Sequence, residues 1–198
     1  PYLLEAMIML DEGMKRETID AAAVKFGMPM GPIELADQVG LDICLHVAEV
    51  LKASLPRPMP DVPQWLRAKV TNGELGRKTG KGFYVWKDGK AQKSAPGTGA
   101  MLTTSGEPRV NASSTEMTDR LILPMINVCV ACLREGVVEN EEIVDGAMIF
   151  ATGFAPFRGG PLHYARTRGI ADVRDTLARL EGKYGPRFKP DAGWDTLS

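Results

Sequence analysis

The chain has 198 residues, a formal net charge of −1 at pH 7 and 44% hydrophobic residues. This composition is typical of a globular protein with one large or two small domains, and it argues against disorder. The near-neutral charge argues against nucleic acid or an anionic membrane as the main partner, and no apolar run is long enough to span a bilayer. Because the chain opens on Pro1 inside an apolar helical pattern, we expect it to be part of a longer protein.

Helical periodicity dominates the first residues of the chain. Apolar residues at spacings of three and four predict an amphipathic helix over residues 1–14. Thr18 is predicted to cap a second helix that ends at Phe26, because Gly27 follows in the position that helix ends favour for glycine.

Two further helices are predicted around a glycine-proline pair. Gly31-Pro32 should open the first of them, since proline suits the first helical position, and Gly40 should close it. The next helix is predicted over residues 41–54, and another over residues 63–71. Four aliphatic side chains of the helix over residues 41–54 are expected to face inward: Ile43, Val47, Val50 and Leu51.

The middle of the chain changes character at residues 94–112, which have no hydrophobic periodicity and read as a linker. Ser113 and Glu116 then form a capping box, with Ser113 at the N-cap and Glu116 three residues later. The helix that they open should run to about Arg134, with a kink at Pro124.

An internal repeat is the most informative feature of the sequence. Residues 1–13 align without gaps on residues 124–136, with the proline and the glycine at the two ends identical. The sequence therefore predicts two tandem helical repeats, over residues 1–93 and 113–198, and the helix at Pro1 should begin upstream of that residue. Further matches pair Asp20 with Asp145, Gly27 with Gly153, Gly31-Pro32 with Gly160-Pro161, Ala36 with Ala165 and Gly40 with Gly169.

A basic, glycine-rich corner interrupts the helical pattern. Residues 75–84, Leu-Gly-Arg-Lys-Thr-Gly-Lys-Gly-Phe-Tyr, hold three glycines and three cations, which a helix interior would not tolerate. A short strand should follow over residues 83–87, and Asp88-Gly89 should form the turn of a small hairpin near residues 83–92. Six cations would suit a phosphorylated ligand such as a nucleotide or coenzyme A, and would equally suit a solvated surface: Arg77, Lys78, Lys81, Lys87, Lys90 and Lys93.

Other residues of the kinds that carry chemistry favour structural roles. Cys129 and Cys132 have a CxxC spacing, but they lie inside an apolar helical pattern with no second Cys or His pair nearby, so we expect two core side chains and no metal site. His46 and His163 have no carboxylate at ligand spacing. Three cysteines without a paired framework favour a reducing compartment.

Two segments beside predicted helix starts remain open to more than one interpretation. Glu34 and Asp37 lie near a helix N-terminus, where acids are common for electrostatic reasons, and the second repeat has His163 and Arg166 in their places. Residues 154–160, Phe-Ala-Pro-Phe-Arg-Gly-Gly, would suit an apolar channel or close helix packing.

The chain has no GxGxxG after a predicted strand, and so no dinucleotide-binding turn.

The two motifs of the first repeat resemble a known family. Residues 30–42, Met-Gly-Pro-Ile-Glu-Leu-Ala-Asp-Gln-Val-Gly-Leu-Asp, and residues 75–84 look like the C-terminal helical domain of 3-hydroxyacyl-CoA dehydrogenases. Residues 153–161 are similar to the second copy of that domain in multifunctional fatty-acid β-oxidation proteins. The resemblance implies an all-α fold of two tandem repeats, of the 6-phosphogluconate-dehydrogenase C-terminal-domain-like type.

In that family, an NAD-binding Rossmann domain precedes the helical domain and supplies the catalytic His and Glu. The resemblance therefore implies NAD in the parent enzyme, no cofactor and no catalytic residue in this chain, and an inactive domain when isolated. An active-site Asn of the family would lie upstream of Pro1, and Asp119-Arg120 stand at the matching place in the second repeat. The implied role is one wall of an acyl-CoA cleft, with these substrate-binding candidates: Gly31, Pro32, Glu34, Asp37, Arg77, Lys78, Lys81 and Tyr84.

The partners implied are an acyl-CoA substrate, the upstream Rossmann domain and a second copy of the chain, in the cytoplasm. One alternative is a non-catalytic helical module for protein–protein interaction or dimerisation. Another is the helical domain of a different β-hydroxyacid dehydrogenase, which should lack the lysine-rich corner.

Overall fold

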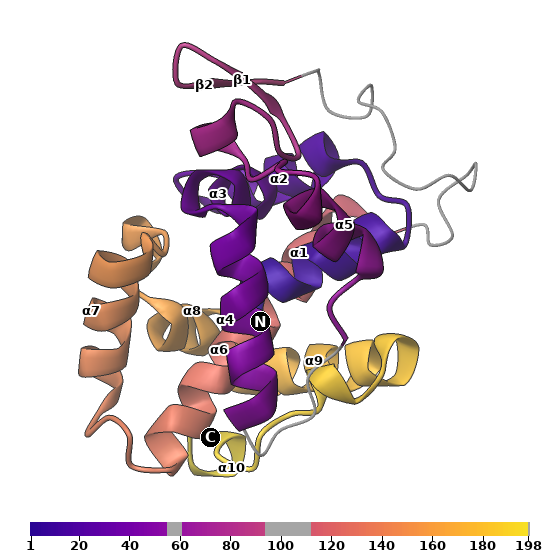
Figure 1. The fold of residues 1–198 in the computed structure, drawn as a ribbon. Helices are drawn as coiled ribbons and strands as arrows, with labels where there is room; N and C mark the ends of the chain where they lie inside the picture. Colours follow the sequence, from indigo (N-terminus) through magenta and orange to yellow (C-terminus); the bar gives the residue numbers. More distant parts are fainter. Residues whose placement is uncertain (55–60, 94–111, 198) are drawn as a thin grey trace. The chain divides into compact units, whose positions relative to one another are not determined.

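The computed structural model describes residues 1–54, 61–93 and 112–197 (Figure 1). Within these ranges, the first half of the chain forms five helices and a hairpin. The helices are α1 (Tyr2–Asp11), α2 (Arg16–Phe26), α3 (Pro32–Val39), α4 (Leu41–Ser54) and α5 (Gln64–Thr71). They are followed by the 3-10 turn η1 (Arg77–Thr79) and by the strands β1 (Val85–Lys87) and β2 (Lys90–Gln92).

The second half is again helical, so the all-α fold is confirmed for the described residues. Its elements are α6 (Ser114–Arg134), α7 (Glu141–Thr152), η2 (Pro156–Arg158), α8 (Pro161–Arg168), α9 (Ile170–Tyr184), η3 (Pro186–Phe188) and α10 (Trp194–Leu197). The predicted linker, residues 94–112, lies outside the described residues except for Ala112. None of the described helices has the length and apolar character needed to cross a bilayer.

The described residues form two compact units. The N-terminal unit holds Leu3–Val24 and Met30–Met117, and the C-terminal unit holds Pro1–Tyr2, Lys25–Pro29 and Thr118–Ser198. The C-terminal unit therefore includes the end of α2 and the turn after it.

Most helix boundaries agree with the sequence predictions. The side chain of Ser113 accepts a hydrogen bond from the Glu116 amide at 3.1 Å, as a capping box predicts, and α6 continues through Pro124. The predicted cap at Thr18 is wrong. The Lys15 carbonyl accepts from both the Thr18 and the Ile19 amides, so α2 begins earlier, at Arg16.

Each repeat holds the N-terminus of one helix with a buried aspartate from the preceding helix. In the N-terminal unit, Asp20 of α2 accepts from the Ile33 amide of α3 at 2.8 Å. In the C-terminal unit, Asp145 of α7 accepts from the Leu162 amide of α8 at 2.7 Å. Buried carboxylates need such donors, and helix N-termini offer unpaired ones. The same bond thus occurs at the two aspartates that the repeat alignment pairs.

The glycine before each of these helices is required by close packing. A Cβ on Gly31 would lie 2.1 Å from Oδ1 of Asp20, and one on Gly160 would lie 2.3 Å from Cβ of Asp145. Because real Cβ atoms do not approach other heavy atoms so closely, only glycine fits where the aspartate reaches the helix end. Pro32 and Pro161 then occupy the first helical positions, where the N–H that proline lacks would have no partner within the helix.

Residues 154–160 pack around Phe26 within the C-terminal unit. Phe154 is buried and meets the Phe26 ring edge-on at 5.7 Å between centroids, and Tyr164 meets the same ring at 5.1 Å. Arg158 lies over the Phe26 ring and its Nε donates to the Phe26 carbonyl at 2.7 Å. Of the two interpretations of this segment, close packing is the one that these contacts support.

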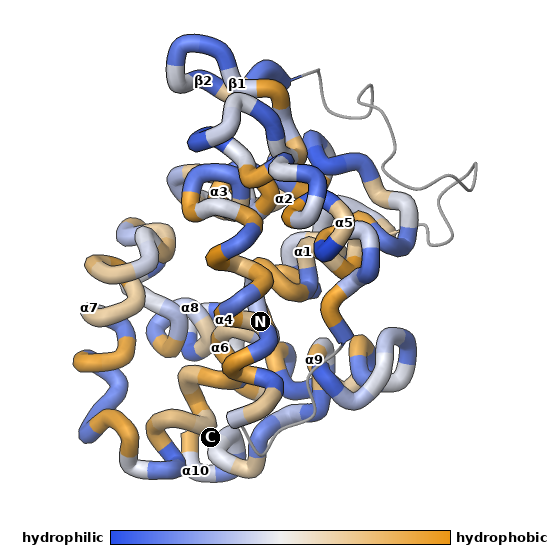
Figure 2. Tube along the Cα trace, in the orientation of Figure 1, coloured by the Kyte–Doolittle hydropathy of each residue, from blue (hydrophilic) through white to orange (hydrophobic). Residues whose placement is uncertain are grey.

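The expectation that α4 faces the core is wrong for most of its aliphatic side chains. Ile43, Val47 and Val50 are each 46–47% exposed, and Leu51 is 39% exposed. These residues follow one another at helical spacing, so α4 presents an apolar stripe to solvent. Figure 2 shows hydrophobic segments along α4. Among the residues of α4, only Leu41 is buried.

Candidate functional site

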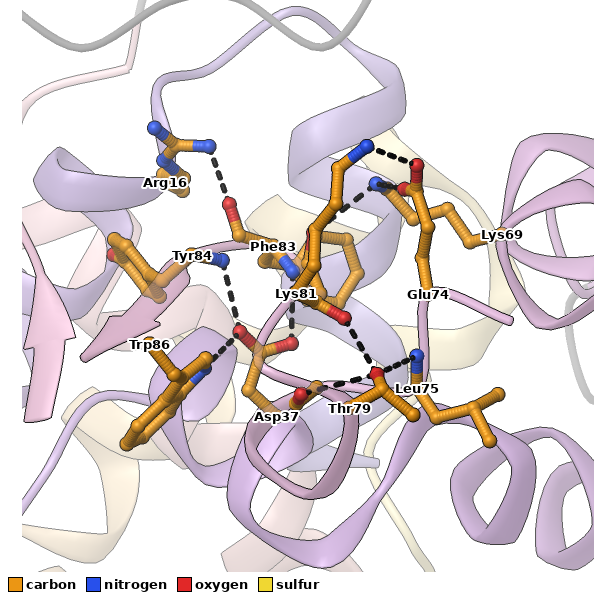
Figure 3. Close-up of polar contacts among 12 residues, drawn as sticks. Arg16, Asp37, Lys69, Glu74, Leu75, Thr79, Lys81, Phe83, Tyr84 and Trp86 are labelled. Carbon is orange, nitrogen blue, oxygen red and sulfur yellow. Dashed lines mark hydrogen bonds and ion pairs between the residues drawn. The ribbon is translucent and has the colours of Figure 1, made fainter. Parts of the chain in front are cut away.

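The centre of the candidate site is the buried carboxylate of Asp37 on α3. Its Oδ1 accepts from the Phe83 amide at 2.8 Å, and its Oδ2 accepts from the Tyr84 amide at 2.8 Å and from Nε1 of Trp86 at 2.9 Å (Figure 3). Asp37 is fully buried, and burial raises the pKa of its carboxyl above the ordinary value while the three donors lower it. One side chain of the first motif thus fixes the end of the second motif by two hydrogen bonds and the following strand by a third.

Two glycines of the basic corner allow this approach. A Cβ on Gly82 would lie 2.2 Å from Oδ1 of Asp37, and one on Gly76 would lie 2.3 Å from the Asp37 carbonyl oxygen. Gly76 also has a φ of +96°, in the region that favours glycine. Gly76 therefore makes room for the backbone of α3, and Gly82 makes room for the carboxylate of Asp37.

Tyr84 connects the Asp37 cluster with Asp20. Its hydroxyl donates to Oδ2 of Asp20 at 2.8 Å, and both side chains are buried. Burial is the main cause that raises the pKa of Asp20 to about 6, and it raises the pKa of the Tyr84 hydroxyl as well. Asp20 thus bonds both the start of α3 and the tyrosine of the corner.

Arg16 and Glu17 complete this side of the site. The guanidinium of Arg16 lies 5.0 Å from the centroid of the Tyr84 ring, and it donates to the Phe83 carbonyl and to Oε1 of Glu17. The other carboxylate oxygen of Glu17 is buried and accepts no hydrogen bond from the described residues. Sequence analysis missed Asp20, Arg16 and Glu17 as site residues. The pairing of Asp20 with Asp145 in the repeat was the one available signal.

Three lysines of the corner form ion pairs with carboxylates. Lys78 bonds Asp42 at 2.6 Å, Lys81 bonds Glu74 at 2.6 Å, and Lys93 bonds Glu34. These exposed ion pairs contribute little to stability.

The structure brings the two predicted motifs together in the N-terminal unit. Gly31 and Pro32 start α3, Glu34 lies on its first turn, and Asp37 and Tyr84 are bonded through backbone and side chain. The carboxylates of Asp20 and Asp37 are enclosed and saturated by protein donors. The arrangement can therefore shape and position a surface, but neither of these two carboxylates is accessible as an acid or base.

The second repeat differs at the matching positions. His163 is exposed, and Arg166 bonds Glu141 at 2.6 Å instead of holding a loop. The carboxylate of Asp119 is bonded to Arg168. An open cavity of about 510 Å³ lies beside Arg166 and contains none of the predicted site residues.

The cysteines and histidines form no second centre in the part of the chain that the structure describes. Cys129 is buried, and burial raises the pKa of its thiol to about 12. No three metal-ligating side chains are grouped to hold an ion within residues 1–54, 61–93 and 112–197.

Comparison with known proteins identifies the region that contains this site. Residues 1–86 match the family described as 3-hydroxyacyl-CoA dehydrogenase, C-terminal domain. The match covers both motifs and the carboxylates of Asp20 and Asp37, and it ends at Trp86.

Two solved structures share the fold over nearly the whole chain. A 3-hydroxybutyryl-CoA dehydrogenase from Escherichia coli K12 is 21% identical, with a TM-score of 0.75 over 99% of this chain and 57% of that one. The dehydrogenase part of multifunctional enzyme 1 from C. elegans is 22% identical, with a TM-score of 0.65 over 100% of this chain and 46% of that one. The chain thus spans about half the length of the structures that it matches.

Proposed function

Because residues 1–86 match the family described as 3-hydroxyacyl-CoA dehydrogenase, C-terminal domain, we propose that this chain forms one wall of the acyl-CoA cleft of an NAD-dependent (S)-3-hydroxyacyl-CoA dehydrogenase in fatty-acid β-oxidation. The observation that carries the proposal is the joining of the two family motifs around Asp37. We assign Glu34, Arg77, Lys78 and Lys81 to the wall that meets substrate, and we place Gly31 and Pro32 behind it because both are buried. Asp37 and Tyr84 hold that wall in shape from beneath, since both are buried.

The described residues do not fit NAD. Rossmann-type sites need parallel strands joined by a helix, whereas β1 and β2 are antiparallel and three residues long. In our proposal, NAD and the catalytic His and Glu belong to a separate Rossmann domain of the same protein. Closure of the two domains would exclude water around the reacting atoms.

Calorimetry with acetoacetyl-CoA tests the proposed cleft. We expect heat of binding from the folded chain, and less from free coenzyme A, because part of the surface is assigned to the acyl group. No heat with either ligand, from protein whose circular dichroism is helical, would refute the cleft. We also expect no NADH when the chain alone is given NAD and 3-hydroxybutyryl-CoA.

A second function, assembly, is favoured by the apolar stripe of α4. Helix faces with several exposed aliphatic side chains are typical of association surfaces, and we propose that the chain is a homodimer through this face. Val47→Glu should then shift sedimentation equilibrium toward monomer, whereas Val137→Glu, at a valine that is 70% exposed in the C-terminal unit, should not. Equal behaviour of the two variants would contradict the proposal.

The remaining features of the proposal concern the parent protein. Tandem copies of the helical domain are typical of the multifunctional β-oxidation type, and we propose the boundaries 1–93 and 113–198 for them. The free cysteines of the described residues suit the reducing cytoplasm that we propose for it.

A further inference from the structure

Three cations of the basic corner have no ion pair with any described residue, unlike their neighbours. Lys69, Lys78, Lys81 and Lys93 each bond a carboxylate. In contrast, none of the carboxylates in the described ranges pairs with the remaining cations of the corner, which are Arg77, Lys87 and Lys90.

These three cations come from three elements that meet at the hairpin turn. Lys87 of β1 and Lys90 of β2 are direct cross-strand partners on either side of Asp88-Gly89. Arg77 of η1 reaches the same turn, because its Nη2 lies 3.3 Å from the place where a Gly89 Cβ would be. In Figure 1 the hairpin lies beyond α3, at the end of the N-terminal unit.

Such an arrangement is unfavourable without a ligand. Like charges directly opposite on a hairpin destabilise it, and their Cβ atoms lie only about 5 Å apart. Three cations and the single carboxylate of Asp88 leave a local charge of +2. This charge complements a phosphomonoester, which carries about −2 at neutral pH and offers three acceptor oxygens.

We propose that Arg77, Lys87 and Lys90 bind a phosphomonoester group of a nucleotide. If the chain binds acyl-CoA as proposed above, this group is the 3′-phosphate of the coenzyme A nucleotide. The assignment moves the phosphate contacts away from Lys78 and Lys81, whose ammonium groups already bond Asp42 and Glu74.

Calorimetry of the full chain with adenosine 3′,5′-bisphosphate tests the phosphate site. Removing one of these exposed charge contacts should weaken binding by about fivefold, so we expect that loss for Arg77→Gln, Lys87→Gln and Lys90→Gln. Lys52→Gln and Arg67→Gln are matched controls, because both are surface cations of the same unit that pair with a carboxylate, and they should change affinity less than about twofold. Equal losses in both groups, or no binding of the bisphosphate, would overturn the proposal.

Two further ligands identify the chemistry that is bound. Adenosine 5′-monophosphate lacks the 3′-phosphate and should bind more weakly than the bisphosphate. Inorganic phosphate should compete only at much higher concentration, and equal affinity for free phosphate would overturn the assignment to a nucleotide.

Stability provides a readout that does not depend on ligand. Lys90→Glu removes the repulsion across the turn, so it should raise the urea midpoint of unfolding while abolishing binding of the bisphosphate. A fall in the midpoint would show that Lys90 is a structural residue and would refute the proposal.

The phosphate site and the proposed function can fail separately. Acetoacetyl-pantetheine lacks the nucleotide, so its binding tests the cleft alone. If it binds as tightly as acetoacetyl-CoA and Arg77→Gln has no effect, the cleft stands and the phosphate site is refuted. If the bisphosphate binds at the hairpin and acetoacetyl-pantetheine does not bind, the phosphate site stands and the cleft is refuted.

Discussion

Replacing Asp37 by Asn should separate the acceptor function of this carboxylate from its size. Asn keeps one oxygen, which can still accept from the Phe83 amide, but it places an NH₂ group against the Tyr84 amide and Nε1 of Trp86. Two buried donors would then lack an acceptor, and each such group costs about 1–3 kcal/mol. Asn also avoids the cost of burying a charge, which offsets part of the loss. We therefore expect the free energy of unfolding to fall by about 2–4 kcal/mol.

Urea unfolding followed by circular dichroism and tryptophan fluorescence measures this loss. Asp42→Asn is the matched control, because the Asp42 carboxylate is not buried and bonds Lys78 at the surface, so its replacement should change stability little. Trp86→Phe removes one donor and leaves the other two bonds of Asp37, so it should cost less than Asp37→Asn. A loss below about 1 kcal/mol for Asp37→Asn, or one equal to that of the control, would refute the role of Asp37 as the anchor of the corner.

Three more predictions concern single positions. Gly82→Ala should destabilise the protein strongly, because the new Cβ would lie 2.2 Å from Oδ1 of Asp37. Gly146→Ala lies inside α7 with open space around the new Cβ, so it should stabilise the protein by about 0.5–1 kcal/mol in the same urea assay. The carboxyl of Asp20 should titrate near pH 6 by NMR, and a midpoint near the ordinary value of 3.8 would contradict its burial. Because the folded protein binds this proton more tightly than the unfolded chain, the contribution of Asp20 to stability falls by up to about 3 kcal/mol as the pH rises from about 4 to 6. Asp20→Asn should remove this pH dependence. Arg158→Lys should lower the free energy of unfolding by about 1–2 kcal/mol, since lysine cannot both lie flat on the Phe26 ring and donate to its carbonyl, and an unchanged urea midpoint would show that these contacts contribute nothing.

Local chemistry made much of the fold predictable from sequence. The hairpin turn is an example, because Asp88 and Gly89 have φ values of +50° and +72°, as an Asp-Gly turn requires. The cap at Ser113 likewise depends only on neighbouring residues. The start of α3 could be predicted from Gly31-Pro32 alone, although the distant Asp20 also holds it.

What sequence analysis missed depends on partners that are distant in the chain. The acids at the start of α3 suggested ordinary helix electrostatics, but Asp37 bonds groups 46 to 49 residues away. Periodicity likewise identified which side chains of α4 share a face, but it carries no information on whether another element covers that face. The sequence therefore predicted which residues form the stripe of α4, but the expectation that they lie in the core was wrong.

The inclusion of residues 25–29 in the C-terminal unit affects how the chain can be divided. Phe26 is separated by more than a hundred residues from Phe154, Arg158 and Tyr164, which surround its ring. Proteolytic cleavage between residues 94 and 112 would therefore leave two pieces that still share one aromatic cluster. We expect such a nicked protein to migrate as a single species on size exclusion, and separately produced halves to complement each other when mixed.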